Sequence, residues 1–197
     1  MKFSVLMGSP RKNGNTSALL TPFIEELEKE GEEVECVWLY DMNIEPCIAC
    51  RNCQKDWTSF ACIHQDQMQG IFDMVLNSDF IVFATPIYSF YCTAPMKAVL
   101  DRLVYGMNKY YGDEKGPSLW AGKKCAILAT CGYKPEKGAD LFEDGMIRYC
   151  KHSKLEYIGM LAVRDLGYKT EFVTKEKIQQ ARDFAHYLLL HKCFKEF

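Results

Sequence analysis

Apolar runs alternate with amphipathic segments along this 197-residue chain, and this alternation strongly restricts the folds open to it. The expected strands are residues 2–7, 33–39, 80–84, 124–130 and 155–163, and the expected helices are residues 16–29, 67–77, 94–107, 137–152 and 174–192. The first, third and fourth strands are nearly continuous apolar runs, which is typical of parallel strands covered on both faces. The pattern predicts a three-layer α/β/α sandwich with a five-stranded parallel sheet of order 2-1-3-4-5. In that order a ligand crevice opens at the carboxyl ends of the first and third strands.

Composition sets the broad class of the protein. With 48% hydrophobic residues, the chain is expected to form one domain over residues 1–197, with a cysteine-rich insertion at 40–66 and a second long loop at 108–122. The net charge of −2, from 24 basic and 26 acidic residues, argues against nucleic acid as a partner. No apolar run approaches the roughly 20 residues of a membrane span, so no membrane partner is expected. Met1 leads almost directly into a strand without a signal peptide, which favours a cytoplasmic location.

The loop after the first strand, residues 8–17 with the sequence GSPRKNGNTS, predicts an anion site. The amides in the first turn of the next helix lack intrahelical partners, the helix dipole favours negative charge, and hydroxyl groups add donors. The loop has neither the glycine spacing of a dinucleotide fingerprint nor the Gly-Lys-Ser/Thr of a P-loop. Hydroxyls without paired lysines indicate a terminal phosphate monoester held without a metal. An ordinary turn and helix cap would need only one of Asn15, Thr16 or Ser17.

Two further loops follow neighbouring strands of the predicted sheet. Residues 84–91, ATPIYSFY, combine aromatic and small residues with a turn fixed by Pro86, and residues 130–133 have the sequence TCGY. A loop of this kind can stack on a planar ring system while its backbone groups bond the ring edge. The predicted topology places both loops beside residues 8–17, which favours a binding role over ordinary core packing.

Three segments together resemble the NADPH-dependent FMN reductase family: GSPRKNGNTS, the run TPIYSFYCTAPMKAVLDR at residues 85–102, and the spacing Cys47-x2-Cys50-x2-Cys53 with Cys62. The resemblance covers about residues 1–165, and within the family it is strongest to the iron–sulfur flavoproteins and their cluster-free relatives. It implies a flavodoxin-like fold with bound FMN, in a homodimer or homotetramer whose partner subunit helps to cover the flavin. The residues it implies at the FMN phosphate are Ser9, Arg11, Asn15, Thr16 and Ser17. Those implied along the isoalloxazine are Pro86, Ile87, Tyr88, Ser89 and Phe90, with Cys131, Gly132 and Tyr133 at its other side.

The resemblance implies an FMN-dependent oxidoreductase that moves electrons from NAD(P)H to a flavin, a quinone or another small acceptor. Such chemistry belongs to the flavin, so no side chain is assigned as catalytic. One alternative is an iron–sulfur flavoprotein that transfers electrons from ferredoxin through a [4Fe–4S] cluster. Another is a non-catalytic regulatory module that binds flavin or metal.

The ten cysteines fall into two groups. Cys47, Cys50, Cys53 and Cys62 lie within sixteen residues, and their thiolates suit a [4Fe–4S] cluster, a zinc ion, or a metal-free role that is structural or redox-active. The eight residues between Cys53 and Cys62 make a wide gap for a cluster. The other cysteines are expected to be small buried hydrophobes; they are Cys36, Cys92, Cys125, Cys131, Cys150 and Cys193.

Residues around the cysteine run leave further alternatives open. Trp57, Phe60 and Ile63 suit a hydrophobic plug, which would raise a thiol pKa, whereas Arg51 and Lys55 would lower it. His64 is expected at the surface, and Asp66 with Gln67 as the cap of the following helix.

The loop at 108–122 suits either a substrate lid or an oligomer contact. Tyr110, Tyr111 and Trp120 are its candidates for stacking on a substrate.

Overall fold

The computed structural model describes residues 1–167 and 170–191. Its strands are β1 (Lys2–Met7), β2 (Glu33–Trp38), β3 (Phe80–Pro86), β4 (Lys124–Cys131) and β5 (Glu156–Arg164). Its helices are α1 (Asn15–Lys29), α2 (Met68–Leu76), α3 (Ala94–Met107), α4 (Pro135–Gly138), α5 (Asp140–Ser153) and α6 (Lys175–Leu189), with short 3₁₀ turns η1 (Leu39–Asp41) and η2 (Asn52–Gln54). All strand pairs are parallel and the order is β2-β1-β3-β4-β5, as predicted.

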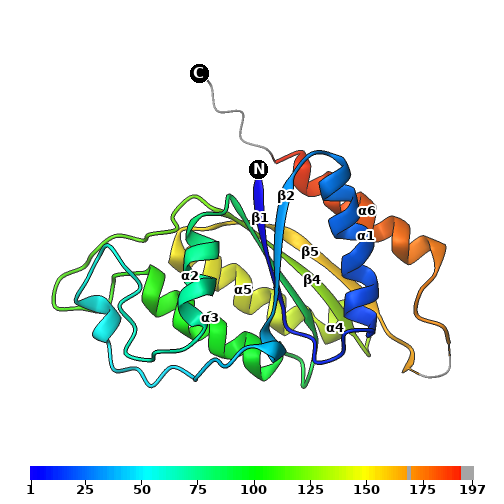
Figure 1. Ribbon diagram of the computed structural model, residues 1–197. Coiled ribbons are helices and arrows are strands. Elements are labelled where there is room, and N and C mark those ends of the chain that lie inside the picture. Colours follow the sequence, from blue (N-terminus) through cyan, green and yellow to red (C-terminus); the bar gives the residue numbers. More distant parts are fainter. Residues whose placement is uncertain (168–169, 192–197) are drawn as a thin grey trace.

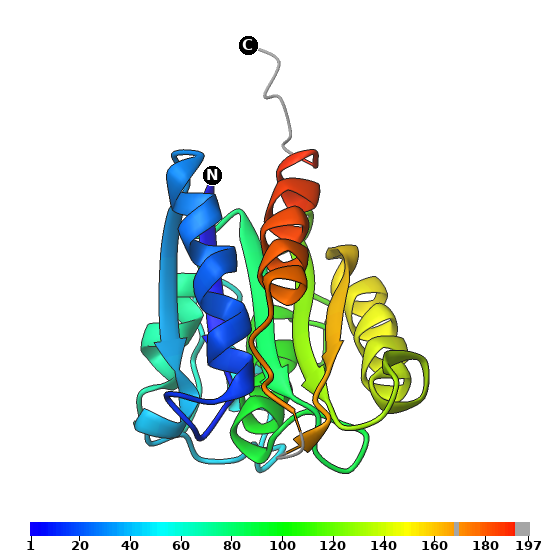
Figure 2. The same ribbon diagram turned by 90° about the vertical axis from the view of Figure 1, so that its right-hand side faces the viewer.

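Helices cover both faces of the sheet (Figures 1 and 2). The helices α1 and α6 pack on one face, where Phe23 and Phe184 join the residues of β1 and β3 that point that way. The helices α2, α3 and α5 pack on the other face, around Phe83 and Ile127. Every residue of β3 and β4 is buried, as expected for central strands covered on both sides.

One expected helix is divided in two. Residues 137–152 were expected to be continuous, but α4 ends at Gly138 and α5 begins at Asp140. A Cβ at Gly138 would lie 3.0 Å from Tyr133 Cβ, so the chain approaches its own preceding loop closely there before it turns into α5. The last expected helix ends at Leu189; Lys192, its expected end, and Cys193 lie outside the described residues.

Four of the isolated cysteines are buried: Cys92, Cys125, Cys131 and Cys150. Cys36 is half-buried. Burial raises the pKa of Cys36 to about 11 and that of Cys92 to about 12. These thiols therefore stay protonated near neutral pH, in agreement with their expected role as small hydrophobes.

The two long connections lie together, beside α2 and α3 and away from α1 and α6 (Figure 1). Residues 40–66 run along α3. After η1, the regular structure in this segment is the short turn η2. Residues 108–122 are closed by a bridge between Asn108 and Ser118. Within the described residues, no helix combines the length and the apolar character needed to cross a membrane.

Candidate flavin site and cysteine pocket

The three predicted flavin loops leave the sheet at one edge, where buried hydroxyl groups connect them. Thr93 Oγ1 donates to the carbonyl of Gly8 (2.8 Å) and ties the start of α3 to the first loop. The hydroxyls of Thr16 and Thr130 lie 2.7 Å apart and connect the first loop to the third. The rings of Phe90 and Tyr133 stack with centroids 5.6 Å apart and connect the second loop to the third. The sheet order therefore brings the three loops together as predicted.

The amino terminus of α1 has the features of an anion site. Its N-cap is Gly14, no side chain caps the helix, and the first turn carries no acidic residue. The alternative of an ordinary Asn15, Thr16 or Ser17 cap is therefore wrong. The first-turn amides keep their donor capacity for a ligand, and the helix dipole favours an anion there.

The predicted phosphate ligands occupy different environments. Arg11 is exposed, while Asn15 and Ser17 are half-buried on the first turn of α1. Ser9 is buried, and its hydroxyl accepts from the amide of Arg11 (3.2 Å), which shapes the loop. Thr16 is 2% exposed and its hydroxyl is bonded to that of Thr130, so it fixes the first loop to the end of β4.

The second loop contains a strained turn. Tyr88 and Tyr91 exchange two backbone hydrogen bonds, of 2.8 and 3.0 Å, and both central residues, Ser89 and Phe90, have positive φ values of 50° and 66°. A type I′ turn has two positive φ values and normally uses Gly or Asn there. Non-glycine residues in this conformation are costly and concentrate at functional sites. Tyr88 and Phe90 are held exposed at the edge by this turn, whereas Pro86 belongs to β3 and Ile87 packs against the core.

The third loop is held by residues at the ends of β4 and β5. The thiol of Cys131 donates to the carbonyl of Tyr133 (3.3 Å), and Arg164 Nε donates to the carbonyl of Gly132 (3.3 Å). Cys131 is 3% exposed, while Gly132 and Tyr133 are open to the surface. Of the three predicted residues, Gly132 and Tyr133 are therefore accessible to a ligand.

Sequence reasoning missed the threonines that organise this edge. Thr85, Thr93 and Thr130 are all buried, and the Thr85 hydroxyl accepts from the amide of Thr93 (3.4 Å). These threonines could have been recognised in the sequence, because each one lies at the carboxyl end of a buried strand or just before α3.

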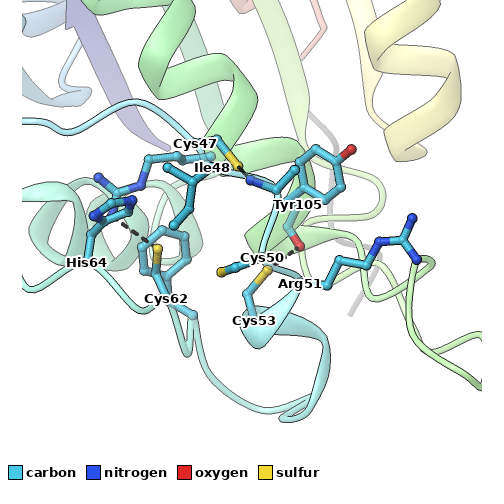
Figure 3. A pocket seen from close by; sticks show the side chains of 11 residues that line it. Cys47, Ile48, Cys50, Arg51, Cys53, Cys62, His64 and Tyr105 are labelled. Carbon is cyan, nitrogen blue, oxygen red and sulfur yellow. Dashed lines mark hydrogen bonds between the residues drawn. The ribbon is translucent and has the colours of Figure 1, made fainter.

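The four clustered cysteines line one pocket (Figure 3). Cys50 and Cys53 lie on one side of it, and Cys62 lies on the other beside His64. In residues 1–167 and 170–191, no three of these sulfur atoms lie within 4.8 Å of one another. Four thiolates on one zinc ion would stand about 3.8 Å apart, given tetrahedral bonds of about 2.3 Å. The sulfurs as they lie here are therefore not gathered around a single ion, and a polynuclear cluster, which would bind each thiolate to a different iron, needs no such close approach.

A buried ion pair fixes the far side of this pocket. Arg102, on α3, donates to the carboxylate of Asp66, to the carbonyl of Glu45 (3.1 Å) and to Cys62 Sγ (3.2 Å). The side chains of Arg102 and Asp66 are 1% and 3% exposed. Burial alone would raise the pKa of Asp66, but the bonds from Arg102 and from the amides of Glu45 and Met68 together lower it.

Two polar atoms that line the cysteine pocket are buried without a hydrogen-bond partner: Nε2 of His64 and Nε of Arg102. Buried donors are rarely left unpaired, so these atoms suit a pocket that holds an acceptor-rich anionic group. Four thiols, a guanidinium on one sulfur and two unpaired buried nitrogens together fit an iron–sulfur cluster. His64 itself is half-buried, so the expected surface residue turns one ring nitrogen toward the pocket.

Two other residues shape the pocket from the opposite side. Gln54 Nε2 lies 3.5 Å from Cys53 Sγ and donates to the carbonyl of Tyr105 (2.6 Å). Lys109 is fully buried, and its ammonium donates to the carbonyls of Cys53 (2.8 Å) and Ser59 (2.6 Å). Burial raises the pKa of Cys53 and lowers that of Lys109.

The cations expected to act on the thiols, Arg51 and Lys55, are both exposed; Arg102 and Lys109 are the buried ones. The expected hydrophobic plug reduces to Phe60, because Trp57 and Ile63 are 40% and 53% exposed. Asp66 and Gln67 were expected to cap α2: Asp66 accepts from the amide of Met68 at its start, whereas Gln67 is the N-cap residue but makes no side-chain capping bond.

A close contact between Phe60 and α3 holds the cysteine segment in place. The ring of Phe60 lies against Gly106 of α3 and stacks on Phe72 of α2, with centroids 4.8 Å apart. A Cβ at Gly106 would overlap the Phe60 ring.

We expect Gly106→Ala to destabilise the protein by about 1–3 kcal/mol through this overlap, although alanine is the better helix former. Urea unfolding measures the change. Gly70→Ala on α2 is the matched control: nothing lies within 4 Å of its new Cβ, so it should gain about 0.5–1 kcal/mol. Equal stabilisation by both changes would contradict the close packing of Phe60.

The loop at 108–122 packs on the cysteine segment and on α5. Tyr111 bonds these two elements: its amide donates to Gln54 Oε1 (3.0 Å) and its hydroxyl bonds His152 (2.6 Å). Trp120 is fully buried and donates to Asn108 Oδ1 (2.9 Å). The expectation that Trp120 stacks on a substrate is therefore wrong, and the lid and oligomer roles of the loop stay predictions.

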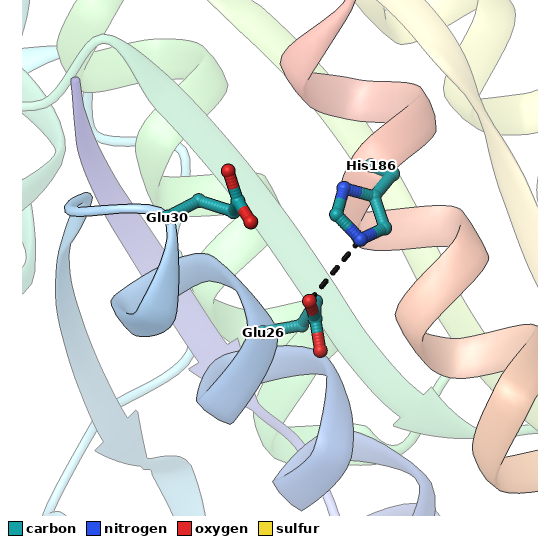
Figure 4. Close-up of side chains that lie close together, drawn as sticks. All are labelled: Glu26, Glu30 and His186. Carbon is teal, nitrogen blue, oxygen red and sulfur yellow. Dashed lines mark ion pairs between the residues drawn. The ribbon is translucent and has the colours of Figure 1, made fainter.

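A second group of metal-ligating side chains lies between α1 and α6 (Figure 4). Glu26 accepts from Lys29 (2.6 Å), while His186 Nε2 and Arg182 Nε lie 3.1 and 3.7 Å from its carboxylate. The hydrogen bond from Lys29 is the largest cause of the lowered pKa of Glu26. Since this carboxylate is already matched by cations, we assign Glu26 to the contact between the two helices.

Comparison with known proteins agrees with this architecture. The model of the NADPH-dependent FMN reductase family matches residues 1–140. An iron–sulfur flavoprotein of Archaeoglobus fulgidus is 37% identical over 140 residues, which are 71% of this chain and 59% of that protein. An iron–sulfur flavoprotein of Methanosarcina thermophila is 31% identical over 105 residues, which are 53% of each protein. The matches therefore span little more than half the length of these two relatives.

Among solved structures, the NAD(P)H:quinone oxidoreductase from Methanothermobacter marburgensis superposes with a TM-score of 0.78 over 98% of both chains. Its identity to this chain is 18%, so it shows the shared fold alone. The sheet order, the three joined loops and the family match over residues 1–140 lead to one conclusion. The chain belongs to the NADPH-dependent FMN reductase family.

Proposed function

We propose that this protein is an FMN-dependent oxidoreductase that takes electrons from NAD(P)H and passes them to a flavin, a quinone or another small acceptor. The observation that carries the proposal is the edge where three loops are joined by Thr93–Gly8, Thr16–Thr130 and Phe90–Tyr133 contacts. This edge combines an uncapped helix terminus with a strained aromatic turn, which suits a phosphate linked to a planar ring.

The chain's own residues would bind and orient the cofactor. The first turn of α1 and the side chains of Arg11, Asn15 and Ser17 would hold the phosphate, and the turn from Tyr88 to Tyr91 would border the ring. When bound, FMN supplies hydride and single-electron transfer, which no side chain here provides. The hydrogen bonds Thr93–Gly8 and Thr16–Thr130 would fix the phosphate end of the site relative to its ring end.

A Thr16→Ala/Ser17→Ala double variant is expected to bind FMN at least tenfold more weakly. It loses the Ser17 hydroxyl at the proposed phosphate site and the buried Thr16–Thr130 bond that fixes the loop, each worth roughly 1–3 kcal/mol when buried. Flavin fluorescence titration of the apoprotein measures the dissociation constant. Thr21→Ala is the control, since its exposed hydroxyl bonds only the carbonyl of Ser17 one turn earlier. Unchanged FMN affinity in the double variant would sink the phosphate assignment.

The activity is tested by anaerobic reduction. Mixing the FMN-loaded protein with NADPH or NADH should bleach the flavin absorbance, and adding a quinone should restore it. A protein that binds FMN but is bleached by neither nicotinamide would exclude the reductase activity and leave the flavin site intact.

A second candidate function is favoured by the cysteine pocket. We propose that Cys47, Cys50, Cys53 and Cys62 ligate a [4Fe–4S] cluster that exchanges electrons between FMN and a carrier such as ferredoxin. The wide spread of the sulfurs and the unpaired nitrogens of His64 and Arg102 support a cluster over zinc. Rapid bleaching by reduced ferredoxin, with little bleaching by nicotinamide, would favour this function over the first.

The exposed aromatic edge also supports self-association. Tyr88, Phe90 and Tyr133 are 46%, 44% and 62% exposed. We propose that a second copy covers this edge in a homodimer or homotetramer, because aromatic side chains are enriched at the centres of interfaces. Analytical ultracentrifugation with and without FMN tests this, and a monomer under both conditions would contradict it.

A further inference from the structure

Lys109 is a buried cation without an acidic partner in contact. In the described part of the chain its ammonium bonds only backbone carbonyls, those of Cys53 (2.8 Å) and Ser59 (2.6 Å). Its side chain is fully buried, so water does not solvate the charge. An unpaired buried charge is strongly unfavourable, and a protein that keeps one needs a compensating anion.

Within the described residues, no acidic side chain contacts the Lys109 ammonium to supply that anion. The other buried cation of the pocket, Arg102, is matched by Asp66 and adds no net charge. The acidic residue whose charge acts on Lys109 is Asp56, but its carboxylate is held within its own turn by Thr58 and Ser59 and makes no bond to the ammonium. Among the described residues, Lys109 therefore places a positive charge beside the pocket that no acidic side chain contacts and that Asp56 offsets only from a distance.

The position of this charge points to the cysteine centre. Lys109 bonds the backbone of Cys53, whose thiol lines the pocket with Cys47, Cys50 and Cys62. A [4Fe–4S] core with four thiolates is anionic and becomes more so when it takes up an electron. A nearby cation in a dry environment stabilises the more negative, reduced form. Net charge and hydrogen bonding around the sulfurs are the quantities that set cluster potentials.

We propose that the buried ammonium of Lys109 raises the reduction potential of the four-cysteine centre and so makes it a better electron acceptor. The inference rests on the iron–sulfur form of the proposed function. The step concerned is the uptake of one electron from an external reductant such as dithionite, in which no bond forms or breaks. Lys109 acts through the field at the centre, so it is a positioning and tuning residue, with no catalytic contact.

The test is an anaerobic redox titration of the FMN-loaded, iron-reconstituted protein with dithionite and mediators, followed by electron paramagnetic resonance. Lys109→Gln removes the charge and keeps an amide that can donate to one of the two carbonyls. It should change the ratio of oxidised to reduced cluster at fixed potential at least tenfold, a fall in midpoint of about 59 mV or more for one electron. Lys109→Arg keeps the charge and should hold the midpoint near that of the parent protein.

Lys123→Gln is the matched control. Lys123 is another partly buried lysine that donates to a backbone carbonyl, that of Ser78, at the amino end of the sheet and away from the cysteine segment. Its replacement should leave the midpoint unchanged. An unshifted midpoint in Lys109→Gln, with iron and sulfide at parental levels, would overturn the proposal.

If Lys109→Gln retains no iron, metal content replaces the midpoint as the measurement. Retention of iron by Lys109→Arg would then support a need for the charge. Equal loss of iron in both variants would mean that Lys109 serves only to pack the fold, and would overturn the inference. Absence of iron from the parent protein after reconstitution with ferrous iron and sulfide would refute the cluster itself. The FMN content of the same sample shows separately whether the flavin function stands.

Discussion

A Cys50→Ser variant is expected to lack the iron and acid-labile sulfide of the proposed cluster and still bind FMN at the proposed flavin site. Cys50 is exposed at the mouth of the pocket that Cys47, Cys53 and Cys62 also line, and serine is a poor ligand for an iron–sulfur cluster. The three proposed flavin loops leave the sheet after β1, β3 and β4, so the proposed flavin site shares no residue with the cysteine segment. Iron, sulfide and flavin analysis of one anaerobically purified sample measures the three contents together.

Cys36→Ser provides the control for this loss. Cys36 is a half-buried residue of β2 outside the cysteine pocket, so its replacement should leave four iron and four sulfide per chain, the content of one [4Fe–4S] cluster. Full iron in the Cys50→Ser protein would remove Cys50 from the ligand set. Loss of FMN together with iron would show that the two sites depend on each other.

An Asp66→Asn variant is expected to lose about 3–5 kcal/mol of unfolding free energy at neutral pH. The change leaves the guanidinium of Arg102 buried without its counter-ion, since the two side chains are 1% and 3% exposed, and breaking a buried pair from one side is costly. It also loosens the cysteine segment, because Asp66 accepts from the amides of Glu45 (2.8 Å) and Met68 (3.1 Å). Urea unfolding with matched slopes measures the difference.

Asp101→Asn is the matched control on the same helix as Arg102. Asp101 pairs with Lys97, but the two side chains are 43% and 48% exposed, and exposed pairs contribute about 0–1 kcal/mol. A similar loss of unfolding free energy in both variants would mean that the buried Asp66–Arg102 pair stabilises the protein no more than the exposed Lys97–Asp101 pair.

The stability difference between the parent protein and the Asp66→Asn variant should depend on pH in a defined direction. The folded pKa of Asp66 is lowered relative to that of the unfolded chain, about 3.9. Its contribution to stability is therefore fully present above about pH 4–5 and is lost as the pH falls through the folded pKa. Unfolding curves at a series of pH values should converge for the two proteins in acid and separate at neutral pH. A gap that widened in acid would contradict the assignment.

The fold was predictable because its signals are local. Nearly continuous apolar runs marked β1, β3 and β4, and their expected bounds differ from the observed ones by no more than two residues. The break between α4 and α5 was not predictable, because it depends on the approach of Gly138 to Tyr133, a contact made only after the loop has folded back.

The cysteine site was predictable in its ligands and unpredictable in its surroundings. The spacing of Cys47, Cys50 and Cys53 is visible in the sequence, whereas Arg102 and Lys109 reach the pocket from residues about forty to sixty positions away. The nearby cations of the sequence, Arg51 and Lys55, turn out to be exposed.

By itself, the sequence determined the succession of strands and helices, the loop that suits a phosphate and the set of clustered thiols, because periodicity and spacing along the chain encode these properties directly. The sheet order followed from the general rules for α/β sandwiches. Only the tertiary structure decided which charges the thiols meet, which predicted residues are accessible, and that Trp120 belongs to the core. Burial and charge pairing arise when distant segments pack together, as Asp66 does with Arg102 and Lys109 with Cys53. The low dielectric that gives these contacts their strength exists only in the folded protein.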